Sequence, residues 1–259
     1  TLTDSTVNGN SSEASGAGIF NHGTLTLTNS TVSENTASEG GGIFNAVSGT
    51  VALTNSIIAN SPNGADCHAS SPITSVGHNL NSDNSCGLTE DTDKPYTDPN
   101  LGPLQDNGGP TFTHTLLPGS PAIDAGDDSV LGEPLNLTTD QRGEGFPRLQ
   151  GSHVDIGAFE SMTCNGKAVT LVGTDGDDFL TGTAGADVIA GLGGDDVILG
   201  LGGNDIICGG DGDDFISGGN GKDRIYGDDG DDTIIGGDSK DRIWGWAGED
   251  MLRGGRGKD

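Results

Sequence analysis

Hydrophobic and polar residues repeat in two different patterns, one at each end of the 259-residue chain. Near the N-terminus, LTDSTV at 2–7 returns as LTNSTV at 27–32 and LTNSII at 53–58, and GIFN occurs at 18 and 42. Short alternating segments rich in β-branched residues, separated by Gly, Asn and Ser, are typical of strands joined by turns. A period of about 25 residues predicts right-handed parallel β-helix coils, each stacked about 4.8 Å above the last.

Stacked coils place equivalent side chains in interior ladders. The first two ladders that we expect are Leu2, Leu27 and Leu53, and Val7, Val32 and Ile58. A third is either Ile19 with Ile43 or Phe20 with Phe44. Asn10, Asn35 and Asn60 are expected at turns, because Asn tolerates left-handed backbone and can bond its stacked neighbour.

The second pattern has a period of nine residues and begins at Gly173. The chain reads GTDGDDFLT, GTAGADVIA, GLGGDDVIL, GLGGNDIIC, GGDGDDFIS, GGNGKDRIY, GDDGDDTII, GGDSKDRIW and GWAGEDMLR, then GGRGKD. Position 1 is always Gly, position 4 is Gly except at Ser239, and position 6 is always Asp. Position 8 is Leu or Ile in all nine complete units.

Each unit predicts a short strand at positions 7–9 with one inward aliphatic side chain, preceded by a Gly-rich turn. Two units then form one flattened coil, so residues 18 apart stack on the same edge. The position 6 aspartates form two columns. One holds Asp178, Asp196, Asp214, Asp232 and Asp250, and the other holds Asp187, Asp205, Asp223, Asp241 and Asp259.

Carboxylates stacked at about 5 Å repel one another, and one aliphatic side chain per unit is a small core to oppose them. Calcium fits this arrangement, because it takes six to eight oxygen ligands in flexible geometry from carboxylates and backbone carbonyls. Magnesium, which requires strict octahedral geometry, fits less well. The alternative is a solvated acidic surface without metal.

Residues 173–259 resemble the RTX (haemolysin-type) calcium-binding β-roll, whose pattern is GGxGxDxUx with a large aliphatic residue at U. The resemblance implies calcium between consecutive loops on each edge, held by the position 6 aspartates and loop carbonyls. It implies up to about eight Ca²⁺ ions, with Ser239 and the two ends departing from the complete pattern. It also implies a secreted protein that folds outside the calcium-poor cytoplasm.

The middle of the chain is irregular and rich in Pro, Gly, Asn and Asp. It contains DPNLGPLQDNGGPTFTHTLLPGSPAIDAGD at 98–127 and TTDQRGEGFPRLQGSHVDIGAFE at 138–160. Together with the preceding coils, these segments resemble the choice-of-anchor Q domain. That resemblance implies a passive extracellular β-helical module of bacterial surface or secreted proteins, placed before a retention device.

Composition narrows the set of partners. The net charge is −28, with 11 Lys plus Arg against 39 Asp plus Glu, which disfavours nucleic acid and anionic membranes and favours cations. No apolar stretch is long enough for a transmembrane span.

Both ends look cut, so a fragment is expected. Two disulfides, Cys67–Cys86 and Cys164–Cys208, are expected over four free thiols, and zinc is disfavoured because no CxxC is present.

An enzymatic interpretation has one serious form, since a β-helix followed by RTX repeats is also the layout of secreted alginate epimerases and some lyases. Such chemistry needs a base and a cation or acid near the sugar. Residues 1–66 contain no Lys, Arg or Tyr and a single histidine, His22. The other histidines, His68, His78, His114 and His153, are scattered. We therefore expect no catalytic residue in this chain.

Late repeats carry KDR, which predicts a basic ladder on one rim of the roll. Its members are Lys222, Arg224, Lys240, Arg242 and Lys258, opposite Asp213, Asp231 and Glu249 on the other rim. Tyr226 and Trp244 should stack, with Trp246 nearby. These ladders could bind an acidic glycan or another copy of the protein, or could merely stabilise the roll.

The sequence thus predicts an all-β protein of two β-solenoids. The expected divisions are β-helix coils at 1–66, an irregular connector at 67–160 and a calcium-loaded β-roll at 161–259. The expected function is an extracellular calcium-binding structural or adhesive module, such as a component of a surface layer or fibre. The alternative is a fragment of a secreted polysaccharide lyase or epimerase.

Overall fold

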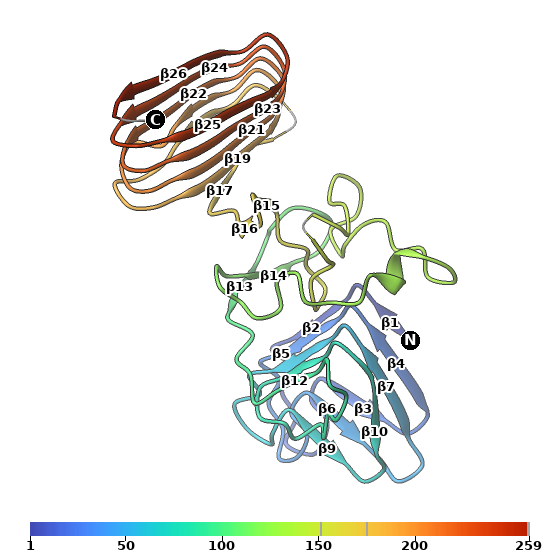
Figure 1. Cartoon of the computed structure of the whole chain (residues 1–259). Coiled ribbons are helices and arrows are strands. Elements are labelled where there is room, and N and C mark those ends of the chain that lie inside the picture. The colour runs from blue at the N-terminus through green and yellow to red at the C-terminus, as the bar shows by residue number, and fades with distance from the viewer. Residues whose placement is uncertain (151, 175, 258–259) are drawn as a thin grey trace. The chain divides into compact units, whose positions relative to one another are not determined.

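A computed structural model describes residues 1–150, 152–174 and 176–257. The chain divides into two compact units, Thr1–Ser161 and Met162–Asp259. Nearly all regular structure in both units is β, as expected, and the 3₁₀ helix η1 (Asp128–Leu131) is the one helix of the described residues (Figure 1). No helix in the described ranges is long and apolar enough to cross a membrane.

The first unit contains three parallel sheets that form the sides of a β-helix (Figure 1). One sheet holds β1 (Leu2–Thr3), β4 (Thr24–Thr28), β7 (Thr50–Thr54) and β10 (Ile73–Gly77). The second holds β2 (Thr6–Asn8), β5 (Thr31–Ser33), β8 (Ile57–Ala59), β11 (Leu80–Asn81) and β12 (Lys94–Pro95). The third holds β3 (Ile19–Asn21), β6 (Ile43–Asn45) and β9 (Cys67–Ala69).

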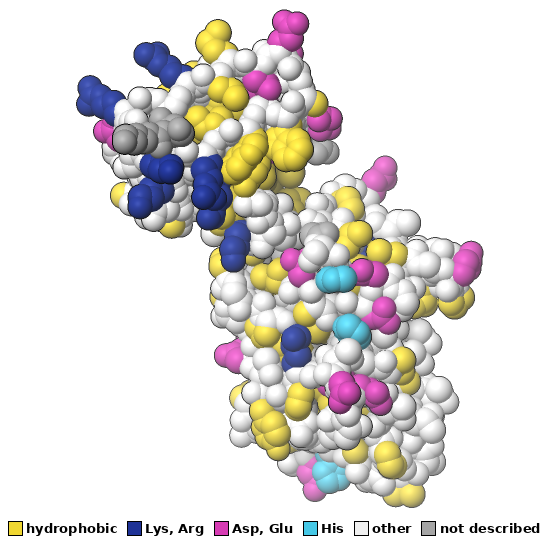
Figure 2. Space-filling model, viewed as in Figure 1, with side chains coloured by type: hydrophobic (Ala, Val, Ile, Leu, Met, Phe, Trp, Pro, Cys, Tyr) yellow, Lys and Arg dark blue, Asp and Glu magenta, His cyan; other side chains and the backbone are white. Residues whose placement is uncertain are grey.

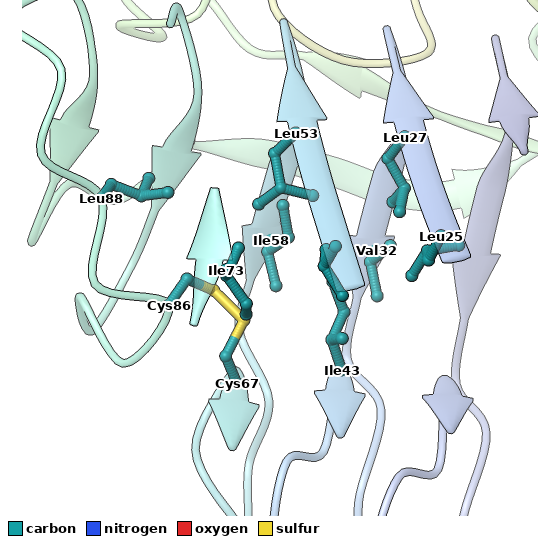
Figure 3. Packing of buried hydrophobic residues seen from close by; sticks show 11 residues of the cluster. Leu25, Leu27, Val32, Ile43, Leu53, Ile58, Cys67, Ile73, Cys86 and Leu88 are labelled. Atoms are coloured by element: carbon teal, nitrogen blue, oxygen red, sulfur yellow. A yellow bond between two sulfur atoms is a disulfide. The ribbon is translucent and has the colours of Figure 1, made fainter. Parts of the chain in front are cut away.

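The expected ladders are in register: Leu2 with Leu27 and Leu53, and Val7 with Val32 and Ile58. Leu27, Leu53, Val32 and Ile58 lie with Ile43 in the interior cluster of Figure 3, and the partly buried Leu2 and Val7 pack against it. Of the two candidates for the third ladder, the isoleucines point inward and Ile43 is fully buried, whereas Phe20 is 51% exposed. Because successive side chains of a strand alternate, Phe20, Phe44 and His68 form a parallel ring stack outside, with centroids 5.0 and 4.9 Å apart.

Asparagines hold the corners of the coils. The Asn10 Nδ2 donates to Asn35 Oδ1 at 2.9 Å, so these two stack as expected. Asn60 adopts a left-handed φ of +59°. Asn29 and Asn55, between the first and second sheets, are also left-handed, with φ of +45° and +46°. A short amide side chain makes this conformation tolerable.

The coils continue beyond residue 66, where the repeated sequence motif ends. Cys67 pairs with Ile43, Ile73 with Val51 and Leu80 with Ile57, which adds strands to all three sheets. Strand pairing between coils requires only a buried apolar side chain at each inward position. It does not require the LTNS sequence motif. The disulfide Cys67–Cys86 was correctly predicted and lies in the same interior cluster.

The rest of the first unit packs against the coils. Its regular part is the antiparallel hairpin of β13 (Leu101–Gln105) and β14 (Thr113–Leu116). Leu116, Ile156 and Phe159 form a second core cluster with the strand residues Ile57 and Leu80. The connector is therefore part of the same folded body as the β-helix.

The second unit is a parallel β-roll. A hairpin of β15 (Thr163–Cys164) and β16 (Lys167–Ala168) precedes it and is held to β21 by the predicted disulfide Cys164–Cys208. One sheet holds β17 (Leu171–Val172), β19 (Val188–Gly193), β21 (Ile206–Asp211), β23 (Arg224–Asp229) and β25 (Arg242–Ala247). The other holds β18 (Phe179–Thr181), β20 (Val197–Leu199), β22 (Phe215–Asn220), β24 (Thr233–Asp238) and β26 (Met251–Arg256).

Neighbouring strands of the roll pair residues 18 apart, as the nine-residue period predicts. In one sheet Ile189, Ile207 and Ile225 are directly in register, and in the other Ile198, Ile216 and Ile234 are. All six are fully buried and form the core between the sheets. The Gly-rich turns therefore stack along the two edges.

Candidate functional site

The position 6 aspartates are buried along the two edges of the roll. Six of them are at most 2% exposed: Asp196, Asp205, Asp214, Asp223, Asp232 and Asp241. They lie in the two columns that the sequence predicts, because each Oδ1 accepts the backbone N–H of the column member one turn earlier. The N–H to Oδ1 distances are 2.8 to 3.1 Å from Asp178 to Asp250 on one edge and 2.9 to 3.0 Å from Asp187 to Asp241 on the other. Asp259, the last predicted member, lies outside the described residues.

The second oxygen of these carboxylates is differently placed. Oδ2 is buried without a hydrogen-bond partner at Asp196, Asp205, Asp214, Asp223 and Asp232. A buried oxygen of an ionised carboxylate without a partner is strongly unfavourable. Five such atoms at equivalent positions are candidate ligands for a cation.

The position 1 glycines show what surrounds these oxygens. A Cβ built on Gly209 would lie 2.1 Å from Asp214 Oδ2 and 2.6 Å from the carbonyl oxygen of Gly227, one turn later. At Gly191 the same distances, to Asp196 Oδ2 and the Gly209 oxygen, are 2.2 and 2.3 Å. A carboxylate oxygen and a carbonyl oxygen of the next turn therefore converge on a space that any larger residue would fill. This explains why position 1 is always Gly.

Burial raises the pKa of these carboxyl groups, to about 6 for Asp205, about 7 for Asp214 and about 6 for Asp232. The negative charge of the column neighbours raises the pKa further, and the bond from the backbone N–H opposes the rise. Without a counterion, the columns therefore disfavour their own ionised form.

The oxygen atoms in these loops suit a hard divalent cation. Carboxylate Oδ2 atoms and backbone carbonyls are the ligands that calcium accepts in flexible geometry. The described residues contain no group of three or more His, Cys, Asp or Glu side chains that could hold a metal. Carbonyl oxygens must therefore supply much of any coordination shell, which suits calcium better than zinc.

The first aspartate of each column has a different environment. Asp178 Oδ2 accepts bonds from the N–H and Oγ1 of Thr174, and Asp187 Oδ2 accepts them from Thr183 at 2.7 and 3.0 Å. These threonines occupy position 2, where later repeats have a left-handed φ, for example +86° at Leu192. Thr is β-branched and avoids this region. The Thr residues thus satisfy the two carboxylates that the sequence also assigned to metal.

Ser239 stands where the other repeats have Gly at position 4. It keeps a left-handed φ of +95°, close to the +98° of Gly194 and the +121° of Gly203. A non-Gly residue in this region is strained by about 1 to 3 kcal/mol. The loop shape is therefore retained at Ser239.

A second polar site, which sequence reasoning missed, lies in the first unit. Arg148 is fully buried, and its Nη2 donates to the carbonyls of Asp155 and Gly157 at 2.9 and 2.6 Å. Its Nε lies 3.7 Å from Glu160 Oε2, and its Nη1 lies 3.7 Å from Asp4 Oδ1. Burial and the charge of Asp155 raise the pKa of Glu160. These groups join the 138–160 segment to the first coil.

Arg142 extends this network. It makes bonds to both carboxylate oxygens of Asp140 and a further bond to the carbonyl of Glu160. Its guanidinium lies over the rings of Phe146 and Phe159, 4.1 and 3.9 Å from their centroids. The charged residues of DQRGEGFPRLQGSHVDIGAFE thus hold together a buried segment that docks on the coils. Their spacing in the sequence does not predict these contacts.

Two of the scattered histidines meet in one cleft. His78 and His153 line a hollow of about 560 Å³ together with Asp124 and Asp128. Asp124 Oδ1 accepts the N–H groups of Ser152 and His153, and Asp128 Oδ2 lies 2.8 Å from His153 Nδ1. These carboxylates connect the loops that form the cleft. The other three histidines do not line it.

A comparison with known protein families supports the nonapeptide repeat of the second unit. The model of the RTX calcium-binding nonapeptide repeat matches residues 172–207, 209–234 and 226–259. A comparison with curated proteins gave no match. The second unit thus carries RTX repeats, which bind Ca²⁺, while the resemblance of the first unit to the choice-of-anchor Q domain stays a prediction.

Proposed function

We propose that this protein is an extracellular structural module whose C-terminal roll becomes ordered when calcium binds between its stacked loops. The observation that carries the proposal is the row of buried Oδ2 atoms without partners, each beside a carbonyl oxygen of the next turn. A bound cation would neutralise the columns and supply the missing partner. Calcium is scarce in cytoplasm and abundant outside cells, so such a roll suits a secreted protein.

The bound ions would be shared between successive turns. The position 6 aspartates Asp196, Asp205, Asp214, Asp223, Asp232, Asp241 and Asp250 are the proposed carboxylate ligands within the described residues. Asp178 and Asp187 are already hydrogen-bonded by threonines. With Asp259 as the last member of the second column by sequence, each column keeps four aspartates and three shared sites. The proposed number of ions is therefore about six, fewer than the eight that ten stacked aspartates allow.

Tryptophan fluorescence offers a direct test, because both tryptophans of the chain, Trp244 and Trp246, lie in the roll. On adding a chelator to the full chain, we expect the β circular dichroism to fall and the tryptophan fluorescence to change as the stack of Trp244 on Tyr226 is lost. Returning calcium should reverse both changes, and magnesium at the same concentration should not. Unchanged spectra after chelation would contradict the proposal.

The adhesive role and the enzymatic alternative are separated by activity. A secreted lyase would generate new unsaturated ends in alginate or pectin, and an epimerase would change the uronate ratio. We expect neither product from the calcium-loaded chain, since RTX repeats are structural and calcium-binding. Either product would favour the alternative.

A further inference from the structure

One outer face of the roll carries a cationic strip, which consists of Lys222, Arg224, Lys240 and Arg242. Arg224 on β23 and Arg242 on β25 are directly in register, and the two lysines precede them by two residues. All four side chains are exposed and line a groove of about 440 Å³ with Asn204, Asp205, Ile206 and Asp223. Figure 2 shows Lys and Arg side chains gathered on this unit beside hydrophobic ones.

The four side chains of the strip make no salt bridge within the described residues, and the two carboxylates that line the same groove, Asp205 and Asp223, are buried. Every salt bridge found in the described part of the chain lies in the first unit. Like charges directly opposite each other on neighbouring strands, about 4.8 Å apart, are destabilising. In a chain of net charge −28, this repeated pair of cations is most simply explained by an external anion that spans both turns.

The form of the strip indicates the chemistry of that anion. Two successive turns offer the same Lys and Arg pair, so a ligand that itself repeats can engage both. Arginine binds carboxylates through two parallel hydrogen bonds. Two residues further along the same strands, Tyr226 and Trp244 stack with centroids 4.7 Å apart, and Trp244 is 38% exposed. Aromatic groups beside cations suit the apolar faces and carboxylates of acidic sugars.

We propose that the cationic strip binds a linear polysaccharide with carboxylates on successive sugars. The proposal rests on the calcium-dependent folding proposed above, because the strip is assembled only when β23 and β25 are stacked. Binding would place negative charge between Arg224 and Arg242 and relieve their repulsion. The partner is thus identified as a polyuronate chain.

The test uses the calcium-saturated full chain and short oligogalacturonates, titrated by calorimetry. Fluorescence with and without chelator first establishes that the roll is folded, so failure of folding is distinguished from failure of binding. Arg224→Gln with Arg242→Gln should weaken binding about tenfold or more, because two charge-assisted contacts are lost. The matched control, Arg253→Gln with Arg256→Gln on β26, removes the same charge and should change affinity less than about threefold.

Several results would overturn the proposal. The first is that folded protein does not bind oligogalacturonate. The second is that the two double variants lose the same affinity for it. The third is that methyl-esterified oligogalacturonate or a short DNA duplex binds as tightly as oligogalacturonate does. Self-association that disappears in the Arg224→Gln, Arg242→Gln variant would assign the strip to a second copy. If the Arg224→Gln, Arg242→Gln variant melts at a lower temperature but binds the glycan unchanged, the cationic strip only stabilises the roll.

Discussion

The backbone N–H of Asp196 donates to Oδ1 of Asp214, 2.9 Å away and one turn later in the roll. The same bond recurs along both edges, so each carboxylate uses one oxygen to join two turns. The other oxygen remains for a ligand. One residue type at one position thus serves backbone pairing and, under the proposed function, cation binding as well.

Neutralising one buried carboxylate should separate these two roles. Asp214→Asn keeps an oxygen that can accept the N–H of Asp196 but removes the charge. We expect calcium affinity to fall about tenfold or more at the affected loops, measured by titration of the fluorescence signal. The neighbouring Asp213→Asn, on an exposed carboxylate, removes the same charge and is the control. Equal effects of the two variants would mean that overall charge, not coordination, controls binding.

The roll should respond to pH in opposite ways with and without calcium. Burial raises the folded-state pKa of Asp205, Asp214 and Asp232 to about 6 to 7, above the ordinary 3.8. Between these values the folded roll binds more protons than the unfolded chain, so its calcium-free stability should rise as pH falls from about 7 to about 4. Calcium competes with these protons, so its affinity should fall over the same range.

Urea unfolding monitored by tryptophan fluorescence checks both trends. In chelator, a larger fraction of the roll should be folded at about pH 5 than at about pH 7.5, and more urea should be needed to unfold it. In excess calcium, the order should reverse. A calcium-free folded fraction that increases with pH would refute the role assigned to the buried columns.

Replacing the two threonines should extend the calcium columns. Thr174→Gly with Thr183→Gly removes the hydroxyls that bond Asp178 and Asp187 and permits the left-handed turn of later repeats. We expect equilibrium dialysis to show about two additional bound ions per chain, rising from about six. A serine pair at the same positions keeps the hydroxyls and should bind as the parent does. Unchanged stoichiometry in the glycine variant would contradict the capping role.

Replacing the buried Arg148 should lower the stability of the first unit and leave calcium binding by the roll unchanged. Arg148→Met leaves the carbonyls of Asp155 and Gly157 and the buried acids without their partner. We expect the first unit to lose about 3 to 5 kcal/mol of unfolding free energy, seen by circular dichroism. Calcium titration of the tryptophan signal should be unaltered. Arg256→Met, at an exposed position, should change neither.

Several features of the fold could be recognised only in the three-dimensional structure. The charged letters around Arg148 are irregularly spaced, and only the packing of 138–160 on the coils shows that they form one network. The strands after residue 66 lack the LTNS motif, although Ile73 and Leu80 still point inward. Phe20 and Ile19 are equally apolar, so their sides of the strand could not be assigned from composition.

The sequence by itself determined the roll and its two aspartate columns. It could do so because a solenoid contacts only its neighbours, which makes the period along the chain equal to the stacking in space. Only the tertiary structure decided which oxygen of each carboxylate remains for a cation and which aspartates the threonines already satisfy. Those distinctions depend on loop conformation and on atoms from the adjacent turn, and these have no counterpart in a repeating pattern of letters.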